Sequence, residues 1–445
     1  MANTNSVLII GAGAAGLAAA RDLAASGVSV TVLEARDRIG GRVHTIRDES
    51  FNLPIELGAE FVHGKHPALF KLLDSARTPF LDVTERHWYF EDGVVSRSNE
   101  FWNKLTALFD LMSKEKPDQT FAQFLDSLPD NPETLRAKAV ATRYVQGFHA
   151  ADIRRAGVHG LIAANEAEDR VGGHHSFRVA TGYETVLQRL NEEAKQQSAI
   201  VKLNAVVTEI KWSRNNVEVN CLSGERRQRF SASRVLITLP LGVLQEKSKT
   251  HAVVRFVPEL PFEKQQAIDG IPMGHVMRIV LVFHERFWEQ LNLSGNGVHE
   301  DLSQLGFIHH PEAAIPTWWT LLPLRAPVLI GWAGGTRAEK FLRLSQAELV
   351  SEALRSLKKI FAVSEVSLRK ALLHSYHHDW NKDPFSRGAY AYLPVDGLNK
   401  QQELARPVQN TIFFAGEATS VGHIGTVHGA LESGQRAAKK ILAGL

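Results

Sequence analysis

The fold is decided by the opening stretch SVLIIGAGAAG (residues 6–16), which continues as LAAARDLAASG (17–27) and VSVTVLE (28–34). The first segment is a short apolar run that ends in glycine, as expected for a buried parallel strand. The second is rich in Ala and Leu and stops at a glycine, which is typical of a helix. The third is rich in β-branched residues and predicts another strand. This order predicts a βαβ unit.

Three glycines in this stretch, Gly11, Gly13 and Gly16, have the spacing G-x-G-x-x-G between strand and helix. The first permits a tight turn, the second lets the backbone approach a pyrophosphate, and the third lets the helix pack on the strand. The helix N-terminus offers free N–H groups and a positive dipole end to that phosphate. Glu34 follows Gly16 by 18 residues, where a carboxylate can bind ribose hydroxyls. These features together predict a dinucleotide-binding site.

Composition limits the number of domains and the classes of partner and metal site that we expect. The chain has 445 residues, 44% of them apolar, which is enough for two or three domains with a dry core. Lys and Arg total 51 against 48 for Asp and Glu, so we expect no nucleic-acid partner. A single cysteine, Cys221, excludes an internal disulfide and a cysteine-based metal cluster.

No apolar run approaches the roughly 20 residues of a membrane span. The N-terminus begins with a short polar lead and has no basic region or cleavage site. We therefore expect no signal peptide, no membrane partner and a cytoplasmic location.

Beyond the opening unit, helical and strand-rich stretches alternate. Apolar periodicity predicts helices within residues 66–80, 100–148, 345–361 and 427–442. Alternation and β-branched runs predict strands within residues 200–257, 276–283 and 411–415. The glycines of 331–335 lack the spacing of a second dinucleotide motif, so we interpret that segment as a turn and expect no pyridine-nucleotide partner.

Four further motifs make the sequence resemble a known protein family. They are EARDRIGGR (34–42), GAEFVHG (58–64), FFAGEAT (413–419) and TVHGALESG (426–434). With the opening unit they resemble the FAD-dependent amine oxidases, which include monoamine, polyamine and L-amino-acid oxidases and the flavin histone demethylases. The resemblance covers the whole chain, and the second and fourth motifs are most similar to polyamine oxidases and histone demethylases. We expect the protein to lack the extra N-terminal domain and helical insertion of those demethylases and the membrane tail of mitochondrial monoamine oxidases.

The resemblance implies a fold of α/β and α+β character. A Rossmann-like FAD-binding domain with a doubly wound sheet would comprise residues 1–80, 176–257 and 384–445. A substrate-binding domain of mixed sheet and helices, comprising residues 81–175 and 258–383, would be interleaved with it. The flavin would lie between the two domains, where ligands commonly bind.

The implied activity is that of an amine oxidase with polyamine preference. A hydride leaves the carbon next to a neutral amine nitrogen, and the resulting imine hydrolyses to an aldehyde and an amine. Molecular oxygen, or another electron acceptor, then takes the electrons, and oxygen gives hydrogen peroxide. The expected partner is thus a small-molecule amine.

The resemblance also assigns cofactor contacts. Glu34 would hold the adenosine ribose, Arg42 the pyrophosphate or flavin, Val207 the adenine, Glu417 a ribityl or ribose hydroxyl, and the backbone of Val427 the flavin pyrimidine. The full set of cofactor-binding residues implied is Gly11, Gly13, Ala14, Ala15, Gly16, Glu34, Ala35, Arg36, Gly41, Arg42, Gly58, Ala59, Glu60, Val207, Pro240, Trp380, Gly416, Glu417, Thr426, Val427 and Ala430.

The implied catalytic residues are His63, Arg278, Tyr390, Trp380 and Thr426. His63 would hydrogen-bond the amine or set its protonation, and the Tyr390 ring would flank a nitrogen that gains positive charge. Trp380 would lie close to the flavin. Thr426 stands where monoamine oxidases carry their second cage tyrosine. Arg278 replaces a lysine that holds a water molecule near flavin N5, which predicts either a slow reaction with oxygen or transfer of the electrons to another acceptor.

Ala389 stands where monoamine oxidases carry the cysteine that bonds to the flavin, so we expect non-covalent FAD. An L-amino-acid oxidase, a monoamine oxidase, a desaturase of an apolar substrate and a flavin-binding scaffold protein remain alternatives. We expect no metal site, because the histidines of 174–175 lack partners at ligand spacing and those of 374–378 lead directly into the Trp380 segment.

Overall fold

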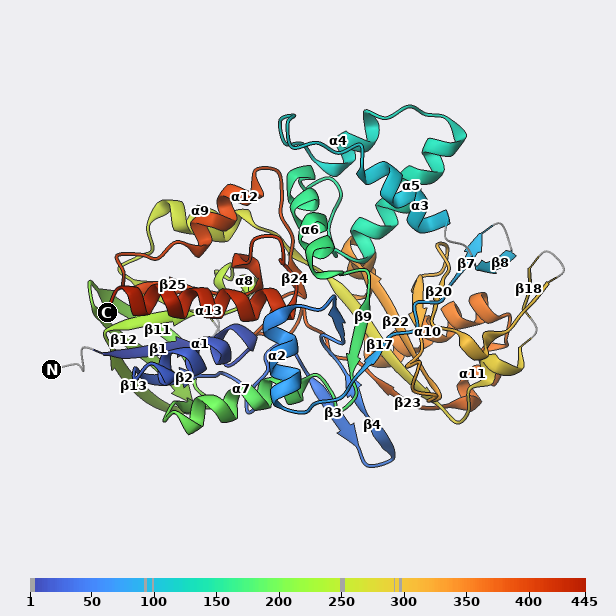
Figure 1. Cartoon of the computed structure of the whole chain (residues 1–445). Helices are drawn as coiled ribbons and strands as arrows, with labels where there is room; N and C mark the ends of the chain where they lie inside the picture. The colour runs from blue at the N-terminus through green and yellow to red at the C-terminus, as the bar shows by residue number, and fades with distance from the viewer. Residues whose placement is uncertain (1–4, 92–93, 98–99, 249–252, 292, 296–297) are drawn as a thin grey trace.

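The computed structural model describes residues 5–91, 94–97, 100–248, 253–291, 293–295 and 298–445. The chain forms two interleaved bodies of sheet and helix, with the opening unit in one of them (Figure 1). No helix in these described ranges is both long and apolar enough to cross a membrane.

The first body is built on a parallel sheet of five strands in the order β10-β2-β1-β14-β25. Its strands are β1 (Ser6–Ile10), β2 (Ser29–Leu33), β10 (Ile200–Lys202), β14 (Arg234–Ile237) and β25 (Ile412–Phe414). One face is covered by α1 (Ala14–Ala25), α7 (Glu184–Gln196) and α13 (Val427–Ala443), and α1 and α13 lie side by side (Figure 1). Strands buried on both faces explain the continuous apolar runs of the sequence.

The opposite face of this sheet packs on a second sheet of four strands in the order β13-β12-β11-β15. The strands are β11 (Val206–Ser213), β12 (Asn216–Ser223), β13 (Arg226–Ala232) and β15 (Arg255–Val257). Two helices, α9 (Phe262–Gly270) and α12 (Gly397–Ala405), pack on each other beside them. Leu260, Ile268 and Ile271 share this core with Leu8 and Ile10, so residues just after 258 pack with the first body.

The second body contains a mixed sheet in the order β23-β17-β22-β21-β20-β7-β8. Its strands are β7 (His87–Glu91), β8 (Val94–Arg97), β17 (Val276–Phe283), β20 (Phe307–His309), β21 (Thr317–Trp319), β22 (Val328–Gly334) and β23 (Leu372–Tyr376). Its helices are α3 (Glu100–Phe109), α4 (Phe121–Asp126), α5 (Pro132–Gly147), α6 (Val158–Val171), α10 (Gln346–Phe361) and α11 (Glu365–Ala371).

Short elements connect the two bodies. They are β3 (Thr45–Asp48), β4 (Phe51–Glu56), β5 (Phe61–His63), α2 (Pro67–Ser75), β6 (Phe80–Asp82), β9 (Ser176–Val179), α8 (Leu241–Leu244), β16 (Met273–Gly274) and β24 (Tyr390–Ala391). Strand β9 pairs with both β5 and β6, and β16 pairs with β24. These pairings bring His63 and Tyr390 to the junction of the bodies.

The α/β and α+β fold class is confirmed, but the predicted turn at residues 331–335 is wrong. Residues 331–334 belong to β22, in the middle of the second body's sheet. Gly331 is glycine because a Cβ would lie 2.7 Å from the Trp318 ring, and Gly334 because a Cβ would lie 2.6 Å from the Gly147 carbonyl oxygen. These glycines permit close packing rather than chain reversal.

Candidate active site

The carboxyl ends of the parallel strands open onto a cavity of about 1300 Å³. Ile10, Leu33, Thr238 and Gly416 line it where β1, β2, β14 and β25 end. This is the edge at which open α/β sheets bind ligands. The volume exceeds the roughly 300–1,000 Å³ of ordinary small-molecule pockets, so the cavity can hold a large cofactor and a substrate together.

The glycine turn forms the first wall of the cavity. Gly11 has a φ of +107°, and a Cβ there would lie 2.7 Å from Thr238 Oγ1. A Cβ on Gly16 would lie 2.0 Å from the Gly11 carbonyl oxygen, so the helix can approach the strand only with glycine at this position. Gly13, Ala14 and Ala15 line the cavity at the N-terminus of α1. The turn therefore presents backbone N–H groups to an anion.

Glu34 lies at the end of β2 and is buried, with its carboxylate on the cavity wall. Its Oε2 accepts from the Ala12 N–H at 2.7 Å, and its Oε1 accepts from the Arg36 N–H at 3.0 Å. Arg36 in turn donates to both oxygens of Asp383 at 2.9 Å. The carboxylate is thus fixed in orientation and retains acceptor capacity for ribose hydroxyls.

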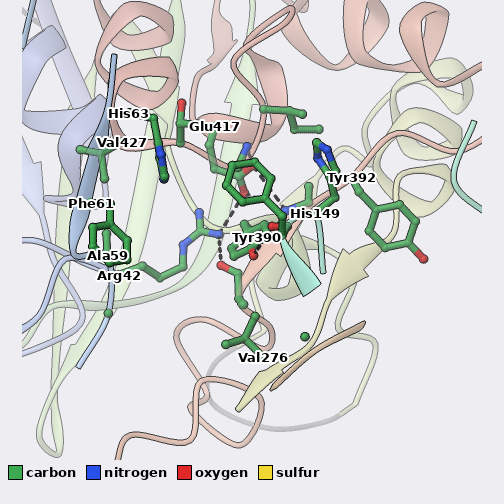
Figure 2. Close-up of a pocket in the computed structure, with 18 of the residues that line it drawn as sticks. Arg42, Ala59, Phe61, His63, His149, Val276, Tyr390, Tyr392, Glu417 and Val427 are labelled. Carbon is green, nitrogen blue, oxygen red and sulfur yellow. Dashed lines mark hydrogen bonds and ion pairs between the residues drawn. The ribbon is translucent and has the colours of Figure 1, made fainter. Parts of the chain in front are cut away.

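Arg42 and Glu417 line the cavity and form an ion pair (Figure 2). Arg42 Nη1 lies 2.9 Å from Glu417 Oε1 and donates to the Ala389 carbonyl oxygen at 2.7 Å. Glu417 Oε2 accepts from the Gly425 N–H at 2.9 Å. Beside it, a Cβ on Gly416 would meet no protein atom within 4 Å, so a side chain there would occupy the cavity. Glycine keeps that space free for a ligand.

Helix α13 points its N-terminus at the same cavity. Thr426 is the N-cap residue: its Oγ1 accepts from the Gly429 N–H at 3.0 Å and donates to the His423 carbonyl oxygen at 2.8 Å. Val427 begins the helix and lines the cavity with Ala430. The positive end of the helix dipole stabilises negative charge at this point. Because the Thr426 hydroxyl is engaged in the cap, its visible role is to hold the helix end.

His63 is at the end of β5 and lines the cavity, as Val427 does (Figure 2). Its ring makes an edge contact with Phe148, with centroids 5.4 Å apart, and Ser176 Oγ lies 3.4 Å from its Nδ1. Burial lowers the pKa of His63, and the weaker influence of Glu85 opposes that shift. The imidazole is therefore neutral near neutral pH and can accept a hydrogen bond from an amine.

Tyr390 and Trp380 provide aromatic surface. The Tyr390 hydroxyl donates to the Phe148 carbonyl oxygen at 2.7 Å, which fixes its ring in the cavity wall. Burial, and to a smaller extent Glu417, raise the pKa of Tyr390, so its hydroxyl stays protonated. Trp380 is buried and donates from Nε1 to the Leu57 carbonyl oxygen at 2.9 Å. Both rings are held by hydrogen bonds to the backbone.

Arg278 lines the cavity from β17 and belongs to a buried ion-pair cluster. Its Nη2 lies 2.5 Å from Glu60 Oε2, and its Nε donates to the Glu56 carbonyl oxygen at 2.9 Å. Arg178 binds the other oxygen of Glu60 at 2.6 Å. Burial alone would raise the pKa of Glu60, but the two guanidinium groups outweigh it and lower that pKa. Glu60 is thus held by two arginines at the edge of the cavity.

The sequence-predicted residues come together in this one cavity. All of the cofactor and catalytic residues named from the sequence line it except Gly16, which packs against the turn behind it. Sequence reasoning missed Phe148 and Tyr144 of the α5 region and Glu168 of α6, which line the same cavity. These residues belong to no motif, and only their place in amphipathic helices could have indicated them.

Within the described ranges, His66, His423 and Glu432 bring possible metal-ligand atoms within 4.8 Å of one another. His66 Nε2 lies 2.7 Å from Glu432 Oε1, and His423 Nδ1 lies 2.9 Å from Glu432 Oε2. The carboxylate thus bridges the imidazoles and ties α13 to the start of α2. These contacts pair one nitrogen of each imidazole with the carboxylate, while His66 Nδ1 is buried without a hydrogen-bond partner among the described residues. We assign no metal to the three groups.

The fold and the cavity define a dinucleotide-binding protein whose second body closes over the ligand site. Residues 14–442 match the family described as flavin containing amine oxidoreductase, and the chain belongs to this family. It is therefore a flavin-dependent amine oxidoreductase.

Relatives come from two branches. The chain is 32% identical to lysine-specific histone demethylase 1 homolog 2 of Arabidopsis thaliana, over 98% of the chain and 58% of that protein. It is 30% identical to probable polyamine oxidase 4 of the same plant, over 98% of the chain and 86% of that protein. A solved structure of wild-type putrescine oxidase bound to putrescine has a TM-score of 0.80 at 22% identity, covers 99% of each chain and shares the fold.

Proposed function

We propose that this chain oxidises polyamines or diamines, using FAD held without a covalent bond. The observation that carries the proposal is the meeting of neutral His63, the fixed Tyr390 ring and the α13 N-terminus in one cavity beside the dinucleotide turn. The resemblance to polyamine oxidases over 98% of the chain supports the substrate class.

FAD, when bound, would supply the acceptor for the hydride and the means to reduce molecular oxygen to hydrogen peroxide, or to reduce another acceptor. The chain would hold it through the glycine turn and Glu34 at one end and through Arg42, Glu417 and the α13 N-terminus at the other.

Ala389 offers no nucleophile where a covalent bond would form. Acid precipitation should therefore release all the flavin into the supernatant, and flavin retained in the pellet would contradict non-covalent binding.

The chain's own residues would prepare the amine. Neutral His63 accepts a proton or hydrogen bond from the amine nitrogen, which keeps its lone pair available. The Tyr390 face stabilises the positive charge that develops on this nitrogen as the hydride leaves the adjacent carbon. Phe148 and Trp380 exclude water from the reacting carbon. The imine product then hydrolyses to an aldehyde and an amine.

The test is anaerobic mixing of the purified protein with spermine while the flavin absorbance is followed. Rapid bleaching is expected. Absence of bleaching by spermine, spermidine and putrescine would overturn the polyamine proposal.

An L-amino-acid substrate is the second candidate, and Arg337 favours it. This side chain lines the cavity and is half-buried, and no ion pair reaches it within the described part of the chain. Burial lowers the pKa of Arg337, and a substrate carboxylate would supply its missing partner. Bleaching by L-amino acids but not by spermine would establish this candidate instead.

The division of the chain into an FAD-binding domain and a substrate-binding domain, and its cytoplasmic location, are also proposals.

A further inference from the structure

Three imidazoles and one carboxylate gather at the start of α13. The His428 ring stacks on the His66 ring, with centroids 4.9 Å apart and planes 17° apart, and it meets the His423 ring edge-on at 4.8 Å. Glu432 accepts hydrogen bonds from His66 Nε2 at 2.7 Å and from His423 Nδ1 at 2.9 Å. Of the three rings, only that of His428 makes no hydrogen bond within the described part of the chain.

His66, His423 and Glu432 form a brace between three helices. His66 is the N-cap residue of α2, His423 lies in the loop before α13, and Glu432 lies in the second turn of α13. His423 Nε2 lies 3.4 Å from the carbonyl oxygen of Ala167 in α6. Burial alone would raise the pKa of Glu432, but the hydrogen bonds from His423 and His66 outweigh it and lower that pKa. The ionised carboxylate therefore fixes the orientation of both rings through charge-assisted hydrogen bonds.

His428 packs on this brace and borders the cavity. Its side chain is in the first turn of α13 and lines the cavity, although the residue is only 4% exposed. Its ring nitrogens make no hydrogen bond to a described residue, and unlike His66 Nδ1 they are not closed off from the cavity. The polar atoms of a residue that is more than nine-tenths buried are thus left for a ligand.

The surroundings keep this imidazole uncharged. Burial, followed by His423, His66 and His63, lowers the pKa of His428 to about 2, and Glu432 opposes the shift. A neutral imidazole carries one N–H donor and one acceptor nitrogen. Because a buried polar group without a partner costs free energy, a ligand atom that pairs with it gains binding energy.

The position of His428 selects an electron-rich partner. The free N–H groups at the start of α13 and the positive end of its dipole favour a carbonyl oxygen or a negative charge and disfavour an ammonium group. The flavin ring has carbonyl oxygens and gains negative charge when it is reduced, whereas the substrate amine has neither property. The imidazole N–H therefore suits the cofactor better than it suits the amine.

We propose that His428 contacts the flavin ring of FAD by donating a hydrogen bond from its imidazole to a ring carbonyl oxygen. Glu432 is the positioning residue for this contact, because it holds His66 and His423, the two rings on which His428 packs. The contact adds a side-chain donor to the backbone donors of the helix. This inference rests on the proposed FAD site, and it does not depend on which amine reacts.

The first test is titration of FAD into the flavin-stripped protein. His428→Leu removes the imidazole N–H with a side chain of similar size, and it should raise the Kd of FAD about three- to tenfold. His428→Gln keeps a side-chain N–H and should restore most of the affinity. An unchanged Kd in His428→Leu would overturn the contact. Equal losses in the two variants would also overturn it, because they would show that only ring packing matters.

The second test is the midpoint potential of the bound flavin. A hydrogen bond donated to the ring is stronger when the ring carries negative charge, so His428→Leu should lower the potential. A loss of packing alone would weaken the binding of oxidised and reduced flavin equally and leave the potential unchanged. An unchanged potential would therefore overturn the proposed hydrogen bond.

Glu432→Gln tests the brace. The amide keeps one acceptor oxygen, so one imidazole loses its partner, and the Kd of FAD should rise about three- to tenfold. In the His428→Leu background the same substitution should have little further effect, because no imidazole remains to be positioned. Additive losses would overturn the positioning role.

Lys439→Gln is the control for Glu432→Gln, since this residue is exposed on the same helix, and its FAD affinity should match that of the unmodified protein. A loss of affinity in Lys439→Gln equal to that in Glu432→Gln would show a general effect of charge on α13 and overturn the role of the brace. Failure of the unmodified stripped protein to bind FAD at all would instead overturn the proposed function, on which the inference rests.

Discussion

The residue on which the proposed chemistry most depends is His63. Replacement by alanine should slow flavin reduction by the amine about 10²-fold, the low end of a general acid–base contribution. Because burial lowers the pKa of His63, the imidazole is neutral at pH 7 and at pH 9, so the loss should be the same at both. Stopped-flow absorbance measures it. His175→Ala, at an exposed position outside the cavity, is the control; unchanged kinetics in His63→Ala would remove His63 from the mechanism.

Arg278 should affect the reaction with oxygen. Arg278→Lys should speed flavin reoxidation several-fold and change reduction by less than about twofold, because lysine can hold a water molecule in the cavity as a smaller and more mobile cation. Arg178→Lys is the matched control, since Arg178 binds the same Glu60 carboxylate but does not line the main cavity. Oxygen-mixing experiments on the reduced protein separate the two steps. If reoxidation is equal in both variants, the identity of this cation does not limit the reaction with oxygen.

At the scale of single residues, the sequence predicts the site residues that belong to motifs but does not predict the site residues that lie outside them. Glu34 is recognisable because the dinucleotide motif fixes its spacing from the glycines of the turn. His63 is recognisable because it lies in the GAEFVHG motif, which resembles polyamine oxidases. Glu168, Phe148 and Tyr144 reach the cavity only through the packing of α5 and α6 within the second body. The sequence also could not show that Glu60 is bound by two arginines, because Arg178 and Arg278 are distant in the chain and meet through tertiary packing.

At the scale of elements, the N-terminus of α13 is the feature to test. Thr426→Ala removes the N-cap and should cost about 0.5–2 kcal/mol of stability, while also weakening FAD binding because the first turn faces the cavity. Ser345→Ala removes the cap of α10, which is distant from the cavity, and should lower stability without changing FAD affinity. Thermal unfolding and flavin titration measure the two effects. Equal FAD affinity in both variants would show that this helix end does not contribute to cofactor binding.

Helices and strands were predicted correctly where a single hydrophobic pattern was strong. The strands of residues 6–10 and 276–283 and the helix of 346–361 follow directly from apolar runs and periodicity. The error at β22 has a physical cause: glycine is required there by Trp318 and Gly147, which lie elsewhere in the chain, whereas local reasoning associates glycine with turns. Close approach between distant elements leaves no local signature.

At the scale of the whole molecule, the two bodies enclose one cavity assembled from distant segments. Its walls include Gly11 and Glu34 near the start of the chain, Val207 in the middle and Glu417 and Val427 near the end. The order of strands predicts this convergence, because parallel strands bring their carboxyl ends to one edge of the sheet. How the second body closes over that edge depends on sheet pairings such as β16 with β24, which sequence patterns do not reveal.

A ligand that spans this cavity should stabilise the fold as a whole. FAD at about 100 times its Kd should add about 2.7 kcal/mol to the free energy of unfolding, because it binds only the folded chain. FMN and riboflavin lack the adenylate that Glu34 and the glycine turn are arranged to hold, so at equal concentration they should raise the Tm of flavin-free protein far less. The measurement is thermal unfolding of the stripped protein with each compound. Equal stabilisation by FMN would mean that the Glu34 end contributes nothing to binding, and that the cavity is a flavin site rather than a dinucleotide site.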